Sequence, residues 1–324
     1  MAVREITYSQ AICESVYRAM ERDERVFTYG EDIAKQGGIF GAYKCLIGKF
    51  PGRVIDTPIS EEVIYGAAVG AALAGTRPVV EYHFADFLFT GMGAVVNQIM
   101  KIRYMAGGQG KLPIVLRGPC GIFNCAAAQH SQDPETLFVH IPGIKVVMPA
   151  TPYDAKGLMA TALKSDDPVI VFEHRRLYAR KGEVPEEDYE IPFGKADVKR
   201  VGRDVTVVTA GVTLWDVLEA ADDLSKEGVE LEVIDLRSLV PWDRDAVAQS
   251  VKKTGRLLVV HEAWKRAGWG AEVAATIQEI CFDYLDAPIL RVCGANVPAP
   301  FSPVLEKEVV VNKERIKAAV RRLL

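Results

Sequence analysis

The sequence predicts an α/β fold made of two doubly wound domains. Short apolar segments alternate with stretches of helical period along most of the chain, a pattern typical of a mostly parallel sheet covered by helices on both faces. The alternation fails between Arg175 and Arg203, where charges and two prolines follow no period. Because such a stretch is typical of a surface linker, we predict a first domain over residues 1–180, a linker over 181–203 and a smaller second domain over 204–324.

The composition is that of an ordinary globular protein with room for two cores. The 324 residues are 49% hydrophobic and 25% charged, which excludes a disordered or fibrous chain. A net charge of −4 gives no sign of binding to nucleic acid or to an anionic membrane. The start MAVREITYSQ has no apolar signal core, and no apolar run is long enough to cross a bilayer. Six scattered cysteines without a CxxC pair are expected to be reduced, buried thiols of a cytoplasmic protein.

The first domain is read from apolar strands, each followed by an amphipathic or capped helix. Thr151 followed by Pro152 is a strong helix start, because the hydroxyl can cap the helix and proline suits its first position. The predicted strands are VFTYG (Val26–Gly30), Val54-Ile55, Pro78–Tyr82, LPIVLRGP (Leu112–Pro119), KVVMP (Lys145–Pro149) and PVIVFEH (Pro168–His174). The predicted helices are Ser9–Arg22, Ala42–Phe50, one from Ser60, Phe89–Met105 and Thr151–Lys164.

The second domain repeats the alternation. Its predicted strands are DVTVVTAG (Asp204–Gly211), VELEVIDL (Val229–Leu236), RLLVVHEA (Arg256–Ala263) and PILRVCG (Pro288–Gly294). Its predicted helices are Leu214–Lys226, Asp243–Lys253, Ala271–Tyr284 and a terminal helix whose basic residues are expected to form a solvated face.

The stretch RVIDTPISEEVIYGAAVGAALAG (Arg53–Gly75) is the most informative part of the first domain. Ser60 is expected to cap a helix with its hydroxyl, and two glutamates follow in the first turn, where the helix dipole favours carboxylates. Gly66, Gly70 and Ala74 recur every four residues, so one face carries almost no side chain and we expect another backbone to pack against it. The acids have a plain alternative role, which is to complement the dipole alone.

Three kinds of side chain are expected beyond the carboxyl ends of the strands, where parallel sheets bind ligands. They are Glu61, an aromatic run (Tyr82, Phe84, Phe87 and Phe89) and His130 in the loop GPCGIFNCAAAQHSQ. An acid, a planar apolar platform and an imidazole would then line one crevice. The alternatives are that the aromatic residues are core and that His130 is an ordinary loop residue. His140, His174 and His261 are interpreted as structural.

Several motifs that bind phosphate are missing. The sequence has no GxGxxG fingerprint, no GxxxxGK[ST] loop, and no Gly-Asp-Gly followed by a distant Asn that would hold Mg²⁺ and a diphosphate. GxSxG and HExxH are missing as well. A cofactor bound in the predicted crevice would therefore be held only in part by this chain.

A set of longer motifs resembles the β subunit of the E1 component of 2-oxo acid dehydrogenase complexes, of the transketolase-like superfamily. The motifs are DTPISE, the GAAVGAALAG helix, AAAQHSQ, GIKVVMPATPYDAKGL, PVIVFEHRRLY, GEVPEEDYEIPFGKA, VIDLRSLVPWD, KKTGRLLVVHEA and PAPFSPVLE. The resemblance covers essentially the whole chain. It looks strongest to the pyruvate and acetoin types and less strong to the branched-chain type.

The resemblance implies a transketolase-like pyrimidine-binding domain followed by a transketolase C-terminal-like domain. It also implies an oxidoreductase that uses thiamine diphosphate in an α2β2 heterotetramer and passes an acyl group to a lipoyl-bearing E2 protein. The α subunit would hold the diphosphate and Mg²⁺. Carried over residue by residue, Glu61 is the cofactor-activating glutamate and His130 the active-site histidine, and the residues that bind the aminopyrimidine are Ile59, Glu61, His83 and Phe87.

The chemistry assigned to Glu61 has a physical basis. A carboxyl bonded to the ring nitrogen N1′ favours the imino tautomer of the pyrimidine, whose nitrogen can take the proton from C2 of the thiazolium. Such a carboxyl should lie in a poorly solvated pocket. For His130, two roles stay open: stabilising charge on the intermediate, or donating a proton to the lipoyl disulfide.

Three positions depart from the family pattern. His83 stands where relatives usually have Met, Gln or Leu, and an ionisable group there could alter substrate choice. Residues 122–125 (IFNC) replace a stretch that is usually richer in glycine. Some relatives bind a structural K⁺ through carbonyls, and Ser165 here replaces a usual Asp among the matching positions, which are Ile114, Ala162, Leu163, Ser165 and Asp167.

Three other functions remain as alternatives at this point. They are a branched-chain E1 β subunit, the C-terminal half of a split transketolase, and an inactive scaffold subunit. A split transketolase needs basic residues for sugar phosphates near the crevice, and the motifs fit it less well. Retention of Glu61 and His130 argues against the scaffold.

Overall fold

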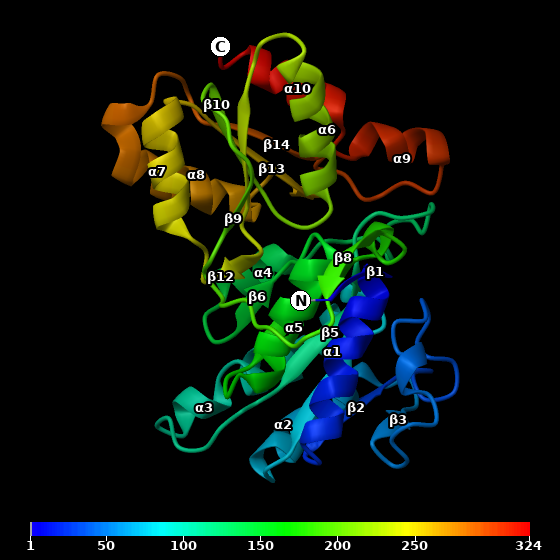
Figure 1. The fold of residues 1–324 in the computed structure, drawn as a ribbon. Coiled ribbons are helices and arrows are strands. Elements are labelled where there is room, and N and C mark those ends of the chain that lie inside the picture. Colours follow the sequence, from blue (N-terminus) through cyan, green and yellow to red (C-terminus); the bar gives the residue numbers. More distant parts are fainter. Residues whose placement is uncertain (1) are drawn as a thin grey trace. The chain divides into compact units, whose positions relative to one another are not determined.

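The structure, a computed structural model, describes residues 2–324 and divides into two compact units. The first unit runs to Cys120 and resumes over Leu137–Phe193, and the second comprises Gly121–Thr136 and Gly194–Leu324. Each unit is an α/β assembly with its own sheet (Figure 1). The segment Gly121–Thr136 belongs by its contacts to the second unit, although its position in the sequence lies within the predicted first domain.

The first unit is built on a parallel sheet whose strands lie in the order β6-β7-β5-β4-β2-β3. Every pairing between these neighbours is parallel. A separate antiparallel ribbon pairs β1 with β8. The bounds are β1 (Val3–Thr7), β2 (Val26–Gly30), β3 (Val54–Asp56), β4 (Arg77–Glu81), β5 (Val115–Cys120), β6 (Lys145–Val147), β7 (Val169–His174) and β8 (Lys181–Pro185).

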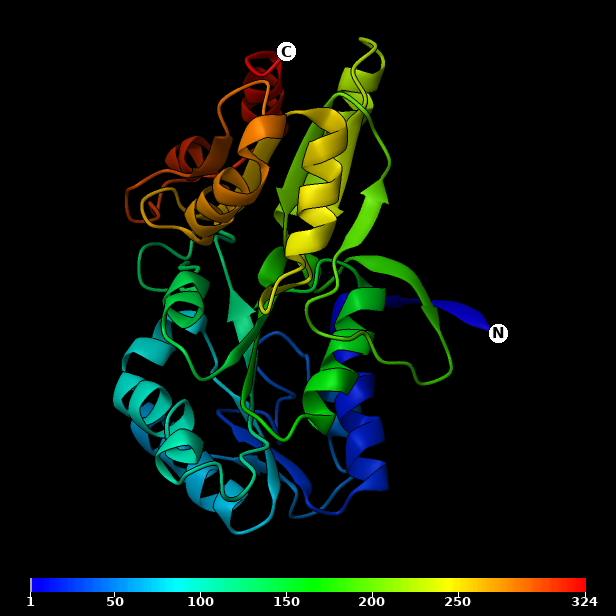
Figure 2. The same cartoon turned by 90° about the vertical axis from the view of Figure 1, so that its left-hand side faces the viewer.

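Two helices of the first unit, α1 and α5, lie side by side (Figure 2). A capping box of Thr7 and Gln10 opens α1, and Thr151 caps α5 by accepting from the Asp154 N–H at 3.0 Å, as predicted. The Ser15 hydroxyl ties the pair by donating to the Lys156 carbonyl at 2.9 Å. The helices are α1 (Tyr8–Arg22), α2 (Glu61–Leu73), α3 (Ile102–Met105), α4 (Glu135–His140) and α5 (Pro152–Lys164), with a π-helix η3 (Gly93–Ile99) and 3-10 turns η1 (Lys44–Leu46), η2 (Ala85–Phe89) and η4 (Arg175–Leu177).

The second unit has a five-stranded sheet in the order β14-β13-β10-β11-β9. Its pairings are parallel except that β9 runs antiparallel to β11. The strands of this sheet are β9 (Asp197–Arg200), β10 (Val205–Thr209), β11 (Leu231–Asp235), β13 (Leu257–Trp264) and β14 (Leu290–Gly294), and the short strand β12 (Ser238–Val240) lies outside it. The helices are α6 (Thr213–Ser225), α7 (Arg244–Thr254), α8 (Trp269–Cys281), α9 (Pro303–Val309) and α10 (Lys313–Arg321), with a 3-10 turn η5 (Phe282–Tyr284).

Several local predictions were wrong. The helix predicted over Ala42–Phe50 is only the 3-10 turn η1, because Gly48, which has a positive φ, interrupts it. The predicted helix Phe89–Met105 is divided between η3 and α3. Ser60 precedes α2, but its hydroxyl makes no capping hydrogen bond.

The segment predicted to be an irregular linker contains two strands, β8 and β9. Each pairs with a strand that is distant in the sequence, β8 with β1 and β9 with β11. A local search for period misses such strands, because their hydrogen bonds depend on a partner far along the chain.

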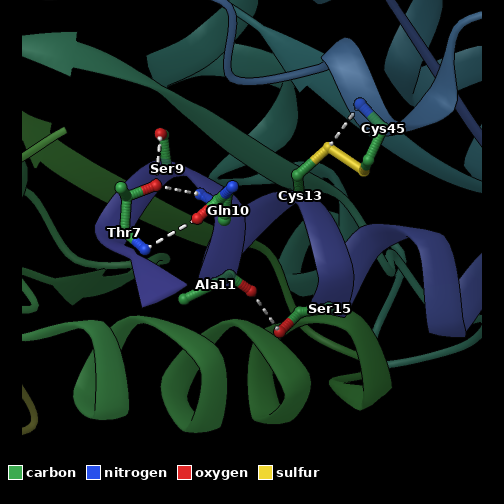
Figure 3. The surroundings of a disulfide bond; sticks show 7 residues. All are labelled: Thr7, Ser9, Gln10, Ala11, Cys13, Ser15 and Cys45. Atoms are coloured by element: carbon green, nitrogen blue, oxygen red, sulfur yellow. Dashed lines mark hydrogen bonds between the residues drawn. A yellow bond between two sulfur atoms is a disulfide. The ribbon is translucent and has the colours of Figure 1, made fainter. Parts of the chain in front are cut away.

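A disulfide joins Cys13 of α1 to Cys45 of η1 (Figure 3). The expectation that all six cysteines are reduced is therefore wrong for this pair, whose Cα atoms lie 6.1 Å apart. The two cysteines are separated by 32 residues in the sequence. A disulfide across a loop of that size reduces the conformational entropy of the unfolded chain and so stabilises the fold by about 3–4 kcal/mol. The remaining cysteines, Cys120, Cys125, Cys281 and Cys293, form no disulfide within the described residues.

The small-residue face of α2 is open in this chain. A Cβ added at Gly66 or Gly70 would meet nothing within 4 Å, and Gly70 and Ala74 are exposed. The expected close packing of another backbone on this face is thus not made within the described residues. Among residues 2–324, no helix is long and apolar enough to span a bilayer.

Candidate active site

The residues of chemical interest in the first unit lie at the carboxyl ends of three neighbouring strands. Strand β2 is flanked by β3 and β4 in the sheet, so the segments that follow these strands share one edge. Glu31 follows β2 directly, Glu81 ends β4, and α2 begins at Glu61 soon after β3. The helix α2 places Glu61 in its first turn, where the dipole favours a carboxylate. Glu61 is half-buried in the chain.

Three rings after β4 form a stacked cluster. The rings of His83 and Phe87 are nearly parallel, with centroids 6.0 Å apart and an interplanar angle of 9°. Phe84 meets both rings edge-on, at 5.3 Å from His83 and 5.4 Å from Phe87. Phe87 keeps part of its surface accessible, whereas Phe84 is buried. Of the two phenylalanines, Phe87 is therefore the one whose ring can stack on a planar ligand, and His83 is also partly accessible.

The other two aromatic residues of the predicted run do not join the platform. Tyr82 is buried, and its hydroxyl donates to the carbonyls of Gly118 and Val171 at 2.8 Å each, so it is a core residue that binds β4 to β5 and β7. Phe89 is 38% exposed.

Two buried glutamates that the sequence interpretation missed adjoin His83. The Nδ1 atom of His83 lies 3.9 Å from Oε2 of Glu81 and 4.0 Å from Oε2 of Glu31. Burial raises the pKa of Glu81 to about 8, although the nearby charge of Arg117 opposes the shift. Burial, and then the charge of Glu61, raise the pKa of Glu31. Each glutamate stands at the end of an apolar strand, and this position is the one signal of them in the sequence.

Tyr65 connects Glu61 with these two glutamates. Burial and the carboxylates of Glu61, Glu81 and Glu31, in that order, raise the pKa of the Tyr65 phenol. Among the described residues, the buried Tyr65 hydroxyl and Oε2 of Glu81 have no hydrogen-bond partner. A side chain at Gly91 would collide with the Tyr65 ring and approach the Glu61 carbonyl to 3.1 Å, so glycine is required there for η3 to pack against α2.

A buried ion pair joins β5 to β7, and its arginine lies opposite Glu81 in the sheet. Arg117 of β5 and Glu173 of β7 are 1% and 0% exposed and form a two-pronged pair, with Nε donating to Oε1 at 2.6 Å and Nη2 donating to Oε2. The Tyr178 hydroxyl donates to Glu173 at 2.9 Å, and the guanidinium lies over the Tyr43 ring at 4.6 Å. Bidentate, fully hydrogen-bonded geometry of this kind is what makes a buried ion pair tolerable.

The remaining predicted residues are placed as follows. Ile59 is 78% exposed just before α2. His130 is half-buried in a turn where its N–H donates to the Ala127 carbonyl at 3.4 Å. Its loop is held within the second unit, since the N–H groups of Ile122 and Cys125 donate to Glu262 and Glu306 at 2.8 and 2.9 Å. That His130 and Glu61 line one crevice stays a prediction.

The five positions matched to a K⁺ site already have hydrogen bonds on their carbonyl oxygens. Arg77 donates to the carbonyls of Leu163 and Ser165 at 3.0 and 2.7 Å, and the others accept from Val169 N–H (Ile114), Ser165 N–H (Ala162) and the Ser165 hydroxyl (Asp167) at 2.9, 3.1 and 2.9 Å. A guanidinium cation thus already lies against two of the oxygens. A K⁺ at these positions stays a prediction.

Replacing Glu81 by Gln is expected to flatten the dependence of stability on pH. Because the pKa of Glu81 is about 8 in the folded chain against 4.5 in a model peptide, its neutral form stabilises the fold fully below pH 4.5. That stabilisation is lost as the pH rises to 8 and is on the order of a few kcal/mol. Thermal unfolding at pH 5 and pH 8 should show a larger drop for the wild type than for Glu81→Gln. Equal drops would contradict the assignment, and the exposed Glu5→Gln serves as the control.

Comparisons with known proteins identify the family. The family described as transketolase, pyrimidine binding domain, matches residues 4–181, and transketolase, C-terminal domain, matches residues 194–316. A solved structure described as a split gene transketolase, inactive beta4 tetramer, has a TM-score of 0.79 at 23% identity and covers 98% of both chains; it shows the shared fold.

Three curated relatives represent three kinds of enzyme. The chain is 45% identical to the 2-oxoisovalerate dehydrogenase subunit beta of Bacillus subtilis, over 98% of each protein. It is 44% identical to the acetoin:2,6-dichlorophenolindophenol oxidoreductase subunit beta of Cupriavidus necator, over 99% of this chain and 98% of the relative. It is also 44% identical to the pyruvate dehydrogenase E1 component subunit beta of Rickettsia felis, over 98% of each. These values do not rank the three types. The chain therefore belongs to the family of E1 β subunits of 2-oxo acid and acetoin dehydrogenases, built from the two transketolase-type domains.

Proposed function

We propose that this chain is the β subunit of a thiamine diphosphate-dependent E1 enzyme that cleaves a 2-oxo acid or acetoin. Together with a separate α subunit it would carry out the oxidative decarboxylation or cleavage and pass the resulting group to a lipoyl-bearing E2 protein. The observation that carries the proposal is the placement of Glu61, a half-buried carboxyl at a helix start, at the same sheet edge as the ring of Phe87. Family membership supplies the reaction class.

The residues present fit the aminopyrimidine half of the cofactor. Phe87 offers a partly accessible ring against which a planar heterocycle can stack. Glu61 offers a carboxyl for a ring nitrogen. The buried Tyr65 hydroxyl and Glu81 Oε2 are polar atoms without hydrogen-bond partners among the described residues, so this edge also holds unused polar capacity.

The protein's part in the chemistry is to hold and move one proton. When bound, thiamine diphosphate supplies the nucleophilic carbon and the electron sink for decarboxylation. Glu61 would hold a proton at the pyrimidine nitrogen N1′ and so select its tautomer. The Phe87 ring would orient the pyrimidine, and the buried surroundings of Glu81 and Tyr65 would exclude water. His130 would act at the substrate or at the lipoyl group.

A partner is required for the rest of the cofactor site. The sequence lacks the Gly-Asp-Gly and distant Asn pattern that holds Mg²⁺ and a diphosphate, so we assign those groups to the α subunit of an α2β2 heterotetramer. The open Gly66–Gly70 face of α2 is a surface on which another backbone can pack closely. A structural K⁺ at Ile114, Ala162, Leu163, Ser165 and Asp167 is part of the family resemblance alone.

We propose the cytoplasm as the location. Four of the six cysteines form no disulfide within the described residues, as expected in a reducing compartment. The Cys13–Cys45 disulfide is at odds with that setting, and counting free thiols in freshly lysed cells would show whether it is present there.

The isolated chain is expected to be inactive and to gain activity only with its α partner. The chain alone and the co-expressed complex would each be assayed with thiamine diphosphate, Mg²⁺ and the acceptor 2,6-dichlorophenolindophenol. Pyruvate, branched 2-oxo acids and acetoin would be compared as substrates, since the relatives do not separate these classes. Turnover by the chain alone would contradict the shared site. A complex that assembles but turns over none of the three would favour an inactive scaffold.

A further inference from the structure

His83 occupies a backbone conformation that residues other than glycine rarely adopt. Its φ is 59°, and the flanking Phe84 N–H donates to the Tyr82 carbonyl across it, which makes a tight three-residue turn. For a residue with a side chain, such a turn costs of order 1–3 kcal/mol of folding free energy, and it persists only where the surrounding packing holds it in place. The turn brings the imidazole back over the end of β4, parallel to the Phe87 ring.

The turn also aims one ring nitrogen at two carboxyls. The Nδ1 atom lies 3.9 Å from Glu81 and 4.0 Å from Glu31, and the three side chains are 15%, 3% and 8% exposed. These separations are too long for hydrogen bonds but lie within ion-pair range. A nitrogen facing two carboxyls is the one that carries the proton, because a bare lone pair there would be repelled. A second proton on the ring would be stabilised by an ionised carboxylate of this pair, even though Glu81, with its pKa of about 8, is largely neutral at pH 7.

The charges around Tyr65 indicate what a protonated His83 would do. Three carboxyls are gathered near Tyr65, and the nearby Arg117 is already paired with Glu173. Arg175, a second buried cation of this region, lies over the Phe84 ring at 5.4 Å. Without a charge on His83, a negative charge on Glu61 would face the acids Glu31 and Glu81 in a poorly solvated site. The titratable or charged groups on the elements packed here are Glu31 and Asp32 after β2, Glu61 and Tyr65 on α2, Glu81 on β4, Asp86 on η2, Arg117 on β5, and Glu173 and Arg175 at the end of β7.

We propose that His83 is a positioning residue and the cationic member of this cluster. Held between Glu81 and Glu31, its imidazolium balances the charge beside Glu61 and keeps the Phe87 ring in place. The proposal deepens the proposed function and rests on it only for the role of Glu61. The protonation state of His83 can be measured on this chain without the α subunit or the cofactor.

The first test reads that protonation directly and needs neither partner nor cofactor. The full chain would be labelled with ¹³C-histidine, and the His83 signal would be assigned by its loss in His83→Gln. We expect a doubly protonated ring at pH 7 in the wild type and a neutral ring at the same pH in Glu31→Gln/Glu81→Gln. A neutral His83 in the wild type at pH 7 would overturn the proposal.

The second test uses the complex with the α subunit. His83→Asn suits the left-handed turn, whereas His83→Gln is closer to the reach of the imidazole, and both remove the charge. In both variants we expect kcat to fall about tenfold, which is the factor that one pKa unit represents. KM should stay within about twofold of the wild-type value. We expect the wild-type kcat to fall at alkaline pH as His83 loses its second proton, and we expect this fall to be lost in both variants.

If the pH profile of kcat keeps its shape in the variants, or if His83→Asn has full activity, His83 acts only through the turn and the proposal is overturned. If no variant and no wild-type complex turns over any substrate, the proposed function fails, while the NMR result still decides the state of His83.

Discussion

Replacing Glu61 by Gln is expected to abolish turnover of the reconstituted complex while leaving the complex assembled. The amide keeps the size and the hydrogen-bonding reach of the carboxyl but cannot give or take a proton at N1′. Loss of a general acid–base of this kind lowers kcat by about 10²–10⁴-fold. Steady-state kinetics of the purified complex measures the loss, and size-exclusion chromatography confirms that assembly is unaffected.

Glu62→Gln is the matched control for this experiment. Glu62 is the next residue in the same first turn of α2 and is exposed, so it experiences the same helix dipole. Unlike Glu61, it is not among the charges that raise the pKa of Glu31 and of Tyr65. Its replacement should leave kcat within about twofold, since a dipole effect at an exposed position is worth only a few tenths of a kcal/mol. Near-normal rates in Glu61→Gln, or equal losses in both variants, would mean that the two acids only complement the dipole.

Replacing Arg117 by Met is expected to destabilise the first unit by about 3–5 kcal/mol, because it leaves the Glu173 carboxylate buried and without its charge partner. For a unit of this size the change corresponds to a fall in Tm of roughly 10 °C. Thermal and urea unfolding would measure it.

Two further variants show whether the lost pairing is the cause. Arg117→Met combined with Glu173→Gln should recover part of the stability, because no charge then remains buried alone. Arg25→Met breaks the exposed pair with Asp23 and should leave Tm unchanged within error, since water screens that pair. A loss below about 1 kcal/mol in Arg117→Met would show that Glu173 is solvated or neutral in the folded chain.

The fold was predictable where the signals were local. The strand Val26–Gly30 was predicted with its observed bounds. The helix after Thr151 was predicted because a threonine cap followed by proline is a local signal of a helix start. The strand Lys181–Pro185 was missed because its partner, β1, is distant in the sequence. The disulfide was missed for a related reason, since sequence spacing does not show which cysteines meet.

The candidate site was predictable only in part. Glu61 and Phe87 were predicted from their positions after strands and from the family motifs. In the structure both follow strands of one sheet, and their roles stay predictions. Glu81 was missed because a glutamate that ends an apolar strand looks like the polar edge of that strand. Its burial, which raises its pKa to about 8, depends on β5 and α2 packing over it. No local pattern records that packing.

The most direct test of the account is the exchange rate of the C2 proton of thiamine diphosphate bound to the complex, measured by NMR after rapid quenching in D₂O. Because Glu61 is assigned the proton at N1′ that sets the tautomer, exchange should be at least about 10²-fold slower in Glu61→Gln than in the wild type at equal cofactor occupancy. Equal exchange rates in the two complexes would contradict the central claim, whatever the turnover of either.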